Sequence, residues 1–282
     1  MTASFIKEIL ESNPDLGTLP NVYHQVEAAV NDPSSSFDAM SRAIESDTAL
    51  TAKLLRIANS SLYNFPGQIA NIDRAISIIG TQQLRDLVLA ATIIRYFNHL
   101  PVAGVDMDSF WRHSIVTALL ARNLASARRE TNVERFYVAA LLHDIGRLLM
   151  YIHLTDQSAK ILSLRDQRQC LLFQAEQEIL GVDHAQLGGD LLAAWRLPRA
   201  FEEPVRHHHD PSMATHYPIE TAVVHVADSI ANALRLGTSG ERYVPPIDDE
   251  AWIRISLPES MLKQIIDHTD KHYHQVVDVF MA

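Results

Sequence analysis

The sequence is poor in cysteine, with Cys170 as its single thiol among 282 residues. It can form no internal disulfide bond, and we expect a reducing compartment such as the cytoplasm. It also lacks a run of about 18 uninterrupted apolar residues, the length that a transmembrane helix requires. Lys7 and Glu8 interrupt the apolar character of residues 1–10, which differ from an export signal. The sequence therefore predicts a soluble, cytoplasmic protein with no membrane span.

Positive charge is also scarce, because 24 Lys and Arg against 34 Asp and Glu give a net charge of -10. Binding to a nucleic-acid backbone relies on clustered Lys and Arg. The segment from Ala75 to Leu89 has the helix, glycine, helix order of a DNA-reading motif, but only Arg74, Arg85 and Arg95 lie in or near it. We therefore expect this segment to serve packing and direct nucleic-acid binding to be absent.

Runs that alternate apolar and polar side chains are nearly absent, whereas helical periodicity dominates, so we predict an all-α fold. Hydrophobic residues make up 47% of the chain, enough for a sizeable core. The more polar stretch Pro101–Asp108 predicts a boundary between a helical N-terminal lobe, residues 1–105, and a second lobe, residues 106–282. An amphipathic helix is expected to end the second lobe, and the oligomeric state is left open.

Capping residues predict where several helices begin. Asp47 suits the position before one helix. The spacing of Thr131 and Glu134 resembles a capping box and predicts a continuous helix from Val133 to about Met150. A further apolar helix is expected over Ile219–Leu236.

Several histidines and aspartates stand within otherwise apolar or helical stretches. A buried imidazole or carboxylate is unfavourable unless something pairs with it, and one divalent metal would pair with many of them at once. We therefore predict a metal site. The candidate ligands are His113, His143, Asp144, His184, His207, His208 and Asp228.

The metal count and type follow from the donor atoms. His143 and Asp144 can bind one metal together at a distorted helix end, or Asp144 can bridge two, so the site is either mononuclear or binuclear. Imidazole nitrogen and carboxylate oxygen suit iron, manganese, zinc or nickel better than calcium. His209, the third residue of its histidine run, is expected to face solvent. His225, one turn before Asp228, is interpreted as a core histidine, with a place beside a metal ligand as the alternative.

The order of these candidates resembles that of the metal ligands in the HD superfamily of helical metal-dependent phosphohydrolases. Further motifs narrow the resemblance to the HDOD domain, a bacterial signalling relative. These motifs are Ile44–Asp47, Lys53–Ser60, Ala75-Ile76, Leu84–Val88 and Ala140–Leu148. The similarity spans roughly residues 15–235. It implies a helical N-terminal lobe, an HD-like lobe and, in most members, a regulatory role.

HDOD domains often lack catalytic ligands, whereas this chain retains candidates for nearly the whole HD set, which implies a bound metal. In the similar HD-GYP phosphodiesterases of cyclic-di-GMP, a lysine follows the HD pair by three residues and a Gly-Tyr-Pro motif follows the histidine pair. Here those places hold Arg147 and His216-Tyr217-Pro218. If the site is catalytic, Asp144 would help to hold the metal that activates water, and Arg147, His184 or His207 would steady phosphoryl oxygens.

Two functions are consistent with these features. The favoured interpretation is a bacterial signal-transduction module with a bound metal, acting through a signalling protein partner or a small phosphorylated ligand. The alternative is a metal-dependent phosphohydrolase or phosphodiesterase acting on a nucleotide or cyclic dinucleotide. Whether the chain is an enzyme is left open, because no glycine-rich phosphate cradle occurs and few basic residues lie near the HD pair.

Overall fold

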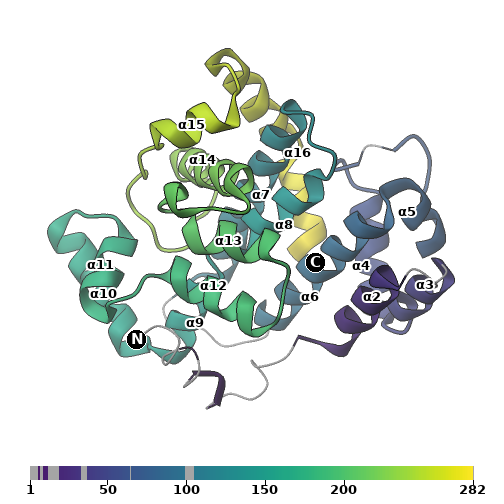
Figure 1. Ribbon diagram of the computed structural model, residues 1–282, viewed down its shortest axis with the longest axis horizontal. Helices are drawn as coiled ribbons and strands as arrows, with labels where there is room; N and C mark the ends of the chain where they lie inside the picture. Colours follow the sequence, from purple (N-terminus) through teal and green to yellow (C-terminus); the bar gives the residue numbers. More distant parts are fainter. Residues whose placement is uncertain are drawn as a thin grey trace. The chain divides into compact units, whose positions relative to one another are not determined.

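The computed structural model describes residues 6, 9–11, 19–32, 37–63, 65–98 and 105–281. Helices are the only regular elements in these ranges, which confirms the all-α prediction (Figure 1). Within the same ranges, no helix is both long and apolar enough to cross a membrane. The predictions that concern Lys7, Glu8 and residues 101–104 lie outside the described residues.

The chain forms two compact units. Unit 1 comprises Met1–Gly17 and Leu100–Thr269, and unit 2 comprises Thr18–His99 and Asp270–Ala282. The C-terminal residues therefore group with the N-terminal helices, although the sequence placed them in the second lobe. The lobe boundary near residue 105 stays a prediction.

Buried apolar side chains from α2 to α6 form the core of unit 2. The helices are α2 (Asn21–Asn31), α3 (Phe37–Glu45), α4 (Thr48–Ala58), α5 (Ile72–Ile79) and α6 (Thr81–Asn98). α4 begins where the Asp47 carboxylate accepts a hydrogen bond from Leu50 N at 3.0 Å, as predicted. Gly80, with φ of 100°, ends α5 and lets α6 begin at the next residue.

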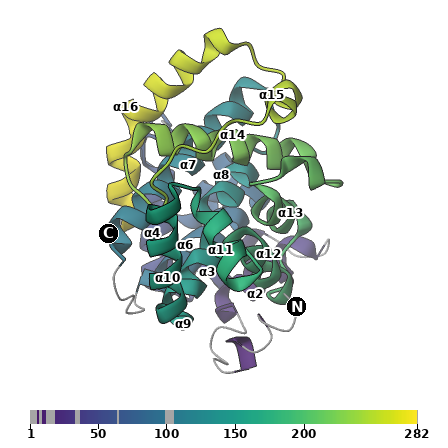
Figure 2. The ribbon, with the colours of Figure 1, turned by 90° about the vertical axis from the view of Figure 1, so that its left-hand side faces the viewer.

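The helices of unit 1 position the candidate metal ligands. They are α7 (Met107–Ala127), α8 (Val133–Leu142), α9 (Ile145–His153), α10 (Thr155–Arg168), α11 (Leu172–Leu180), α12 (His184–Ala194), α13 (Arg199–His207), α14 (Pro218–Leu234) and α15 (Asp249–Ile255), with the short 3-10 helices η2 (Pro211–Met213) and η3 (Glu259–Met261). α7, α8 and α14 pack side by side (Figures 1 and 2). α12 packs against α9 and α13, so the ligand-bearing helices surround one interior region.

The final helix, α16 (Leu262–Met281), begins in unit 1 and ends in unit 2. It is amphipathic as predicted, since Ile265, Tyr273, Val276 and Phe280 are buried. Within unit 2, Lys53 Nζ donates a hydrogen bond to the Phe280 carbonyl oxygen at 2.6 Å. This contact satisfies one of the acceptors that a helix leaves at its C-terminus.

Candidate metal centre

The chain breaks its helix at His143 and Asp144, which differs from the continuous helix predicted over Val133–Met150. α8 ends at Leu142 and α9 begins at Ile145, with His143 and Asp144 between them. Gly146 explains how α9 can approach α12, because a Cβ there would lie 2.0 Å from the His184 carbonyl oxygen. The break turns both side chains into the interior of unit 1, where they are 0% and 1% exposed.

One cluster of metal-ligating atoms joins α7, the helix break and α14. His113, His143 and Asp228 each offer an atom within 4.8 Å of the others, and all three are buried. His113 Nε2 lies 3.1 Å from Asp228 Oδ1, and His143 Nε2 lies 3.3 Å from the same oxygen. Asp144 Oδ2 lies 3.2 Å from His143 Nε2. These atoms converge from elements that are far apart in the sequence.

A second cluster joins α12 to the end of α13. His184, His208 and His209 also offer atoms within 4.8 Å of one another. His184 Nε2 lies 2.9 Å from His209 Nε2 and 3.4 Å from His208 Nε2. Asp144 Oδ1 lies 2.9 Å from His184 Nε2, whereas its Oδ2 faces the first cluster. Asp144 therefore stands between the two clusters with one oxygen toward each.

Three imidazole rings are oriented so that Nε2 points into the site. Their Nδ1 partners are Ala140 O for His143 (2.7 Å), Val205 O for His208 (2.8 Å) and Glu176 Oε2 for His184 (2.6 Å). Since these oxygens accept, each Nδ1 carries a proton, and Nε2 is the ring nitrogen left to bind a metal once it is deprotonated. Oxygen partners behind metal-binding imidazoles are the usual arrangement in metal sites.

Several buried atoms of the site lack a hydrogen-bond partner of suitable geometry among the described residues. They are both ring nitrogens of His113, Nε2 of His143 and both carboxylate oxygens of Asp144. Buried polar atoms without a partner are uncommon in native proteins because each is costly to desolvate. A metal ion would supply the missing partner, so the donor set is compatible with one. The described residues thus contain buried His/Asp clusters that could hold a metal.

Charge in the site is strongly coupled. Burial lowers the pKa of His143, but the carboxylates of Asp144 and Asp228 outweigh burial and raise that pKa to about 10. Burial and Arg147 lower the pKa of His184, yet Glu176 and Asp144 raise it to about 9. Burial raises the pKa of Asp144, but Arg147, His143 and His184 hold it well below its usual range. Both histidines are therefore protonated at neutral pH while no metal is bound.

This protonation predicts that metal affinity rises with pH. A metal must displace the protons of His143 and His184, so lowering the pH from 8 to 6 weakens binding and raising it strengthens binding. Titration calorimetry at pH 7 in buffers of different ionisation enthalpy is expected to show release of about two protons when both clusters are filled. Metal binding without proton release would contradict this prediction.

The structure brings six of the seven predicted ligands together and leaves one apart. His207 is the last residue of α13, is half-buried and lies outside the clusters found among the described residues. His209 was expected to face solvent, but it is only partly exposed and its Nε2 contacts the His184 ring. The end of α13 explains the difference, because the chain leaves the helix at His207 and turns the next two side chains toward α12.

Variants of His207 and His209 directly test the assignment of His209, and not His207, to the second cluster. His209→Ala is expected to weaken metal binding at the second cluster by at least about tenfold, because it removes a metal-ligating atom. His207→Ala is the matched control and is expected to leave metal affinity within about twofold. Competition titrations with a chromogenic chelator measure both. Equal losses in the two variants would contradict the assignment.

His225 is buried and also contacts the site. Its Nδ1 lies 2.7 Å from His208 O, and its Nε2 accepts a hydrogen bond from Asp248 N at 2.9 Å. Nδ1 must therefore donate to the His208 carbonyl. His225 is a core histidine that fixes the backbone of His208. Both interpretations made from the sequence therefore apply, because His225 is buried in the core and also lies beside a candidate metal ligand.

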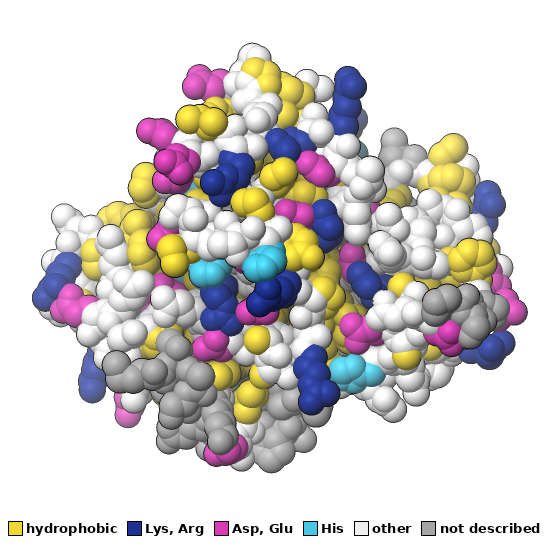
Figure 3. Space-filling view, viewed as in Figure 1, with side chains coloured by type: hydrophobic (Ala, Val, Ile, Leu, Met, Phe, Trp, Pro, Cys, Tyr) yellow, Lys and Arg dark blue, Asp and Glu magenta, His cyan; other side chains and the backbone are white. Residues whose placement is uncertain are grey.

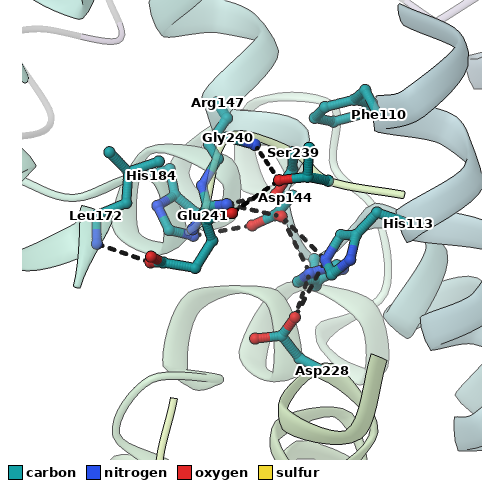
Figure 4. A network of polar contacts seen from close by, with 12 residues as sticks. Phe110, His113, Asp144, Arg147, Leu172, His184, Asp228, Ser239, Gly240 and Glu241 are labelled. Atoms are coloured by element: carbon teal, nitrogen blue, oxygen red, sulfur yellow. Dashed lines mark hydrogen bonds and ion pairs between the residues drawn. The ribbon is translucent and has the colours of Figure 1, made fainter. Parts of the chain in front are cut away.

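Two further residues of the site have no sequence signal. Glu176 Oε2 accepts hydrogen bonds from both His184 N (2.8 Å) and His184 Nδ1, and Glu176 is 2% exposed. Ser239 lies between α14 and α15, is fully buried, and its hydroxyl accepts a hydrogen bond from Arg147 Nη1 (Figure 4). Neither residue belongs to a recognisable motif. The Glu176 contact depends on how α11 packs beside α12, and the Ser239 contact joins Arg147 to a loop that is far away in the sequence.

Glu176 is expected to control the second cluster. Glu176→Gln removes the charge that orients the His184 ring, and we expect metal binding there to weaken about 10- to 100-fold. Glu178→Gln is the control, since Glu178 is exposed and pairs with Arg168. Metal titrations of both variants measure the difference. Wild-type affinity in Glu176→Gln would show that the His184 ring needs no carboxylate.

Arg147 is enclosed rather than presented to a ligand. It is 3% exposed, and its Nη1 lies 3.2 Å from Asp144 Oδ2. Its Nε lies 3.8 Å from Glu176 Oε1. These contacts, with that to Ser239, place Arg147 behind the carboxylates of the site.

A cavity of about 600 Å³ lies beside the second cluster. His207 and His209 line it, and Phe173 stacks on the His209 ring with centroids 4.3 Å apart. Figure 3 shows histidine and cationic side chains at the surface over α12 and α13. Arg206 also lines the cavity, but its guanidinium pairs with Asp190 at 2.7 Å and with Glu202 at 3.1 Å. The cavity is therefore polar without an unpaired arginine.

Comparison with known proteins identifies the family of the chain. The model of the HDOD domain matches residues 16–211. A curated relative, an uncharacterized protein of Treponema pallidum (strain Nichols), is 22% identical over 210 residues. That match covers 74% of this chain but only 40% of the relative.

Solved structures share the fold over nearly the whole chain. An HDOD domain protein from Geobacter sulfurreducens has a TM-score of 0.78 at 26% identity, and the match covers 99% of this chain and 96% of that chain. A protein from Shewanella amazonensis SB2B, named “Putative metal-dependent phosphohydrolase”, has a TM-score of 0.65 at 20% identity and covers 99% of this chain and 100% of its own. At 20% identity, the likeness to the Shewanella amazonensis protein shows the fold alone.

Proposed function

Since the chain belongs to the HDOD domain family, we propose that it is a bacterial signal-transduction module with divalent metal bound by its His/Asp clusters. The observation that carries the proposal is Asp144, whose two oxygens face separate groups of buried metal-ligating atoms. The module would act through a signalling protein partner or a small phosphorylated ligand.

The two ligand sets would form two metal positions. One would use His113, His143, Asp144 and Asp228, and the other would use Asp144, His184, His208 and His209. Nitrogen and oxygen donors of this kind suit iron, manganese, zinc or nickel. His207 would face the neighbouring cavity instead of a metal.

The fixed charge of the site supports a divalent ion. Asp144, Asp228 and Glu176 are buried carboxylates, and the buried Arg147 guanidinium offsets one of their charges. Two negative charges therefore remain when the imidazoles are neutral, which matches one divalent metal. A second divalent ion would leave a positive excess that an anionic ligand would balance.

A metal-dependent phosphohydrolase is the second candidate, because the cavity of about 600 Å³ adjoins the second metal position. A bound divalent metal lowers the pKa of its water and polarises a phosphoryl oxygen. Asp144 would help to hold that metal. However, Arg147 is enclosed, so it would position Asp144 instead of contacting a substrate, and Arg206 is already paired. These contacts favour the signalling module.

Turnover assays distinguish the two functions. We expect metal-loaded protein to hydrolyse cyclic dinucleotides, nucleotides and generic phosphodiesters no faster than the Asp144→Asn variant. Each metal is tested separately, and metal content is measured in the same samples. Hydrolysis by the wild-type protein that disappears in Asp144→Asn would replace the signalling proposal with the enzyme.

A further inference from the structure

Unit 2 contains a cavity of its own, of about 300 Å³, between α4, α6 and the end of α16. All of its lining residues belong to unit 2, so the cavity is independent of the metal centre in unit 1. Lys53, Arg56, Arg95 and Asn98 line it together with small apolar side chains and Met281. No carboxylate is among the described residues that line it.

The cavity has an excess of positive charge. Asp47 pairs with Arg95 at 2.7 Å and offsets one of the three cations. Lys53 donates to a carbonyl oxygen, Phe280 O, and the Arg56 guanidinium has no ion pair or hydrogen bond with the residues that the structure describes. The C-terminus of α16 contributes about half a negative charge. Among the described residues, the cations that line the cavity therefore outnumber the carboxylates that pair with them.

The environment of Lys53 reflects this excess. Burial, followed by the charges of Arg56 and Arg95, lowers the pKa of Lys53 to about 8. A cation that is half-buried beside two other cations is destabilised unless an anion accompanies it. The geometry therefore favours an anionic ligand, although the C-terminus of α16 already supplies some negative charge.

We propose that this cavity binds a small phosphorylated molecule whose phosphoryl group contacts Lys53, Arg56 and Arg95. Arginine donors match phosphate oxygens in pairs, and lysine adds a point charge. The apolar wall and the Asn98 amide would contact the remainder of the ligand. A volume of about 300 Å³ suits a ligand no larger than a nucleoside monophosphate. The site would give the signalling module a ligand input separate from its metal centre.

Calorimetry with 5′-AMP and inorganic phosphate tests the proposal on the full chain. The Asp144→Asn background is used throughout, since phosphate could otherwise bind at the metal centre. We expect saturable binding that Arg56→Gln weakens by at least about tenfold, because one charge-assisted contact is lost. Arg42→Gln is the matched control, an exposed arginine of unit 2 that lies outside the cavity, and should bind like the parent.

Lys53→Met provides a second variant, and circular dichroism checks that it folds. If it unfolds, the exposed Arg56 decides the test alone. The proposal is overturned if neither probe binds saturably at millimolar concentration, or if Arg56→Gln binds as tightly as Arg42→Gln. It is also overturned if a polyaspartate peptide binds and neither phosphorylated probe does. None of these results bears on metal content, so the proposed function is tested separately.

Discussion

Asp144→Asn is expected to remove the stabilisation that metal gives to the protein. Asparagine keeps the shape of the side chain but loses the charge that faces both clusters. A ligand present at about 100 times its Kd stabilises the folded state by about 2.7 kcal/mol. For a chain of this size we expect metal to raise the wild-type Tm by about 5–10 °C and the variant Tm by about 1 °C or less.

Thermal unfolding with metal and with chelator measures this difference. Asp210→Asn is the matched control, because Asp210 is exposed at the cavity and outside both clusters. It should keep the wild-type response to metal. Equal metal-induced stabilisation in wild type and Asp144→Asn would contradict the bridging role of Asp144.

Gly146→Ala is expected to destabilise the fold by about 3 kcal/mol or more. The added Cβ would lie 2.0 Å from the His184 carbonyl oxygen and 2.7 Å from Gly188 N, so backbone atoms of α12 would have to move. Because this movement displaces His184, the second metal position should also weaken. Chemical denaturation and metal titration measure the two effects.

Gly188→Ala is the comparison on the facing helix. Its Cβ would meet the side chains of Val205 and Ile145 at 3.0 and 3.2 Å, and the Gly146 backbone at 3.3 Å. Side chains can shift, and alanine is favoured within a helix, so we expect a change of about 1 kcal/mol or less. If Gly146→Ala is as mild as Gly188→Ala, the close approach of α9 and α12 does not fix the site.

The sequence predicted the features that depend on local pattern. The absence of two-residue alternation indicated an all-helical chain, and Asp47 caps α4 as expected. The resemblance to the HDOD domain is confirmed by the match to residues 16–211. Polar side chains that are unfavourable to desolvate but lie inside apolar segments correctly indicated burial of His143, Asp144 and Asp228.

Features that depend on tertiary packing were not predictable. The cap of α8 is a local exception: the sequence favoured Thr131, but Asn132, one residue later, caps the helix, and its side chain accepts from Arg135 N at 3.2 Å. A run of three histidines does not show where α13 ends. The sequence therefore could not indicate that His209 lies in the second cluster and that His207 lies outside it. Glu176 reaches the site only because α11 packs beside α12, a contact without a short-range signal.

The central claim is that the His/Asp clusters hold metal, and elemental analysis of tag-free protein tests it most directly. A histidine tag is omitted because it would itself bind metal. We predict about one to two ions of iron, manganese, zinc or nickel per wild-type chain, and less than about a tenth of that in Asp144→Asn. Wild-type protein that is folded but free of metal, even after incubation with each of these ions, would contradict the claim.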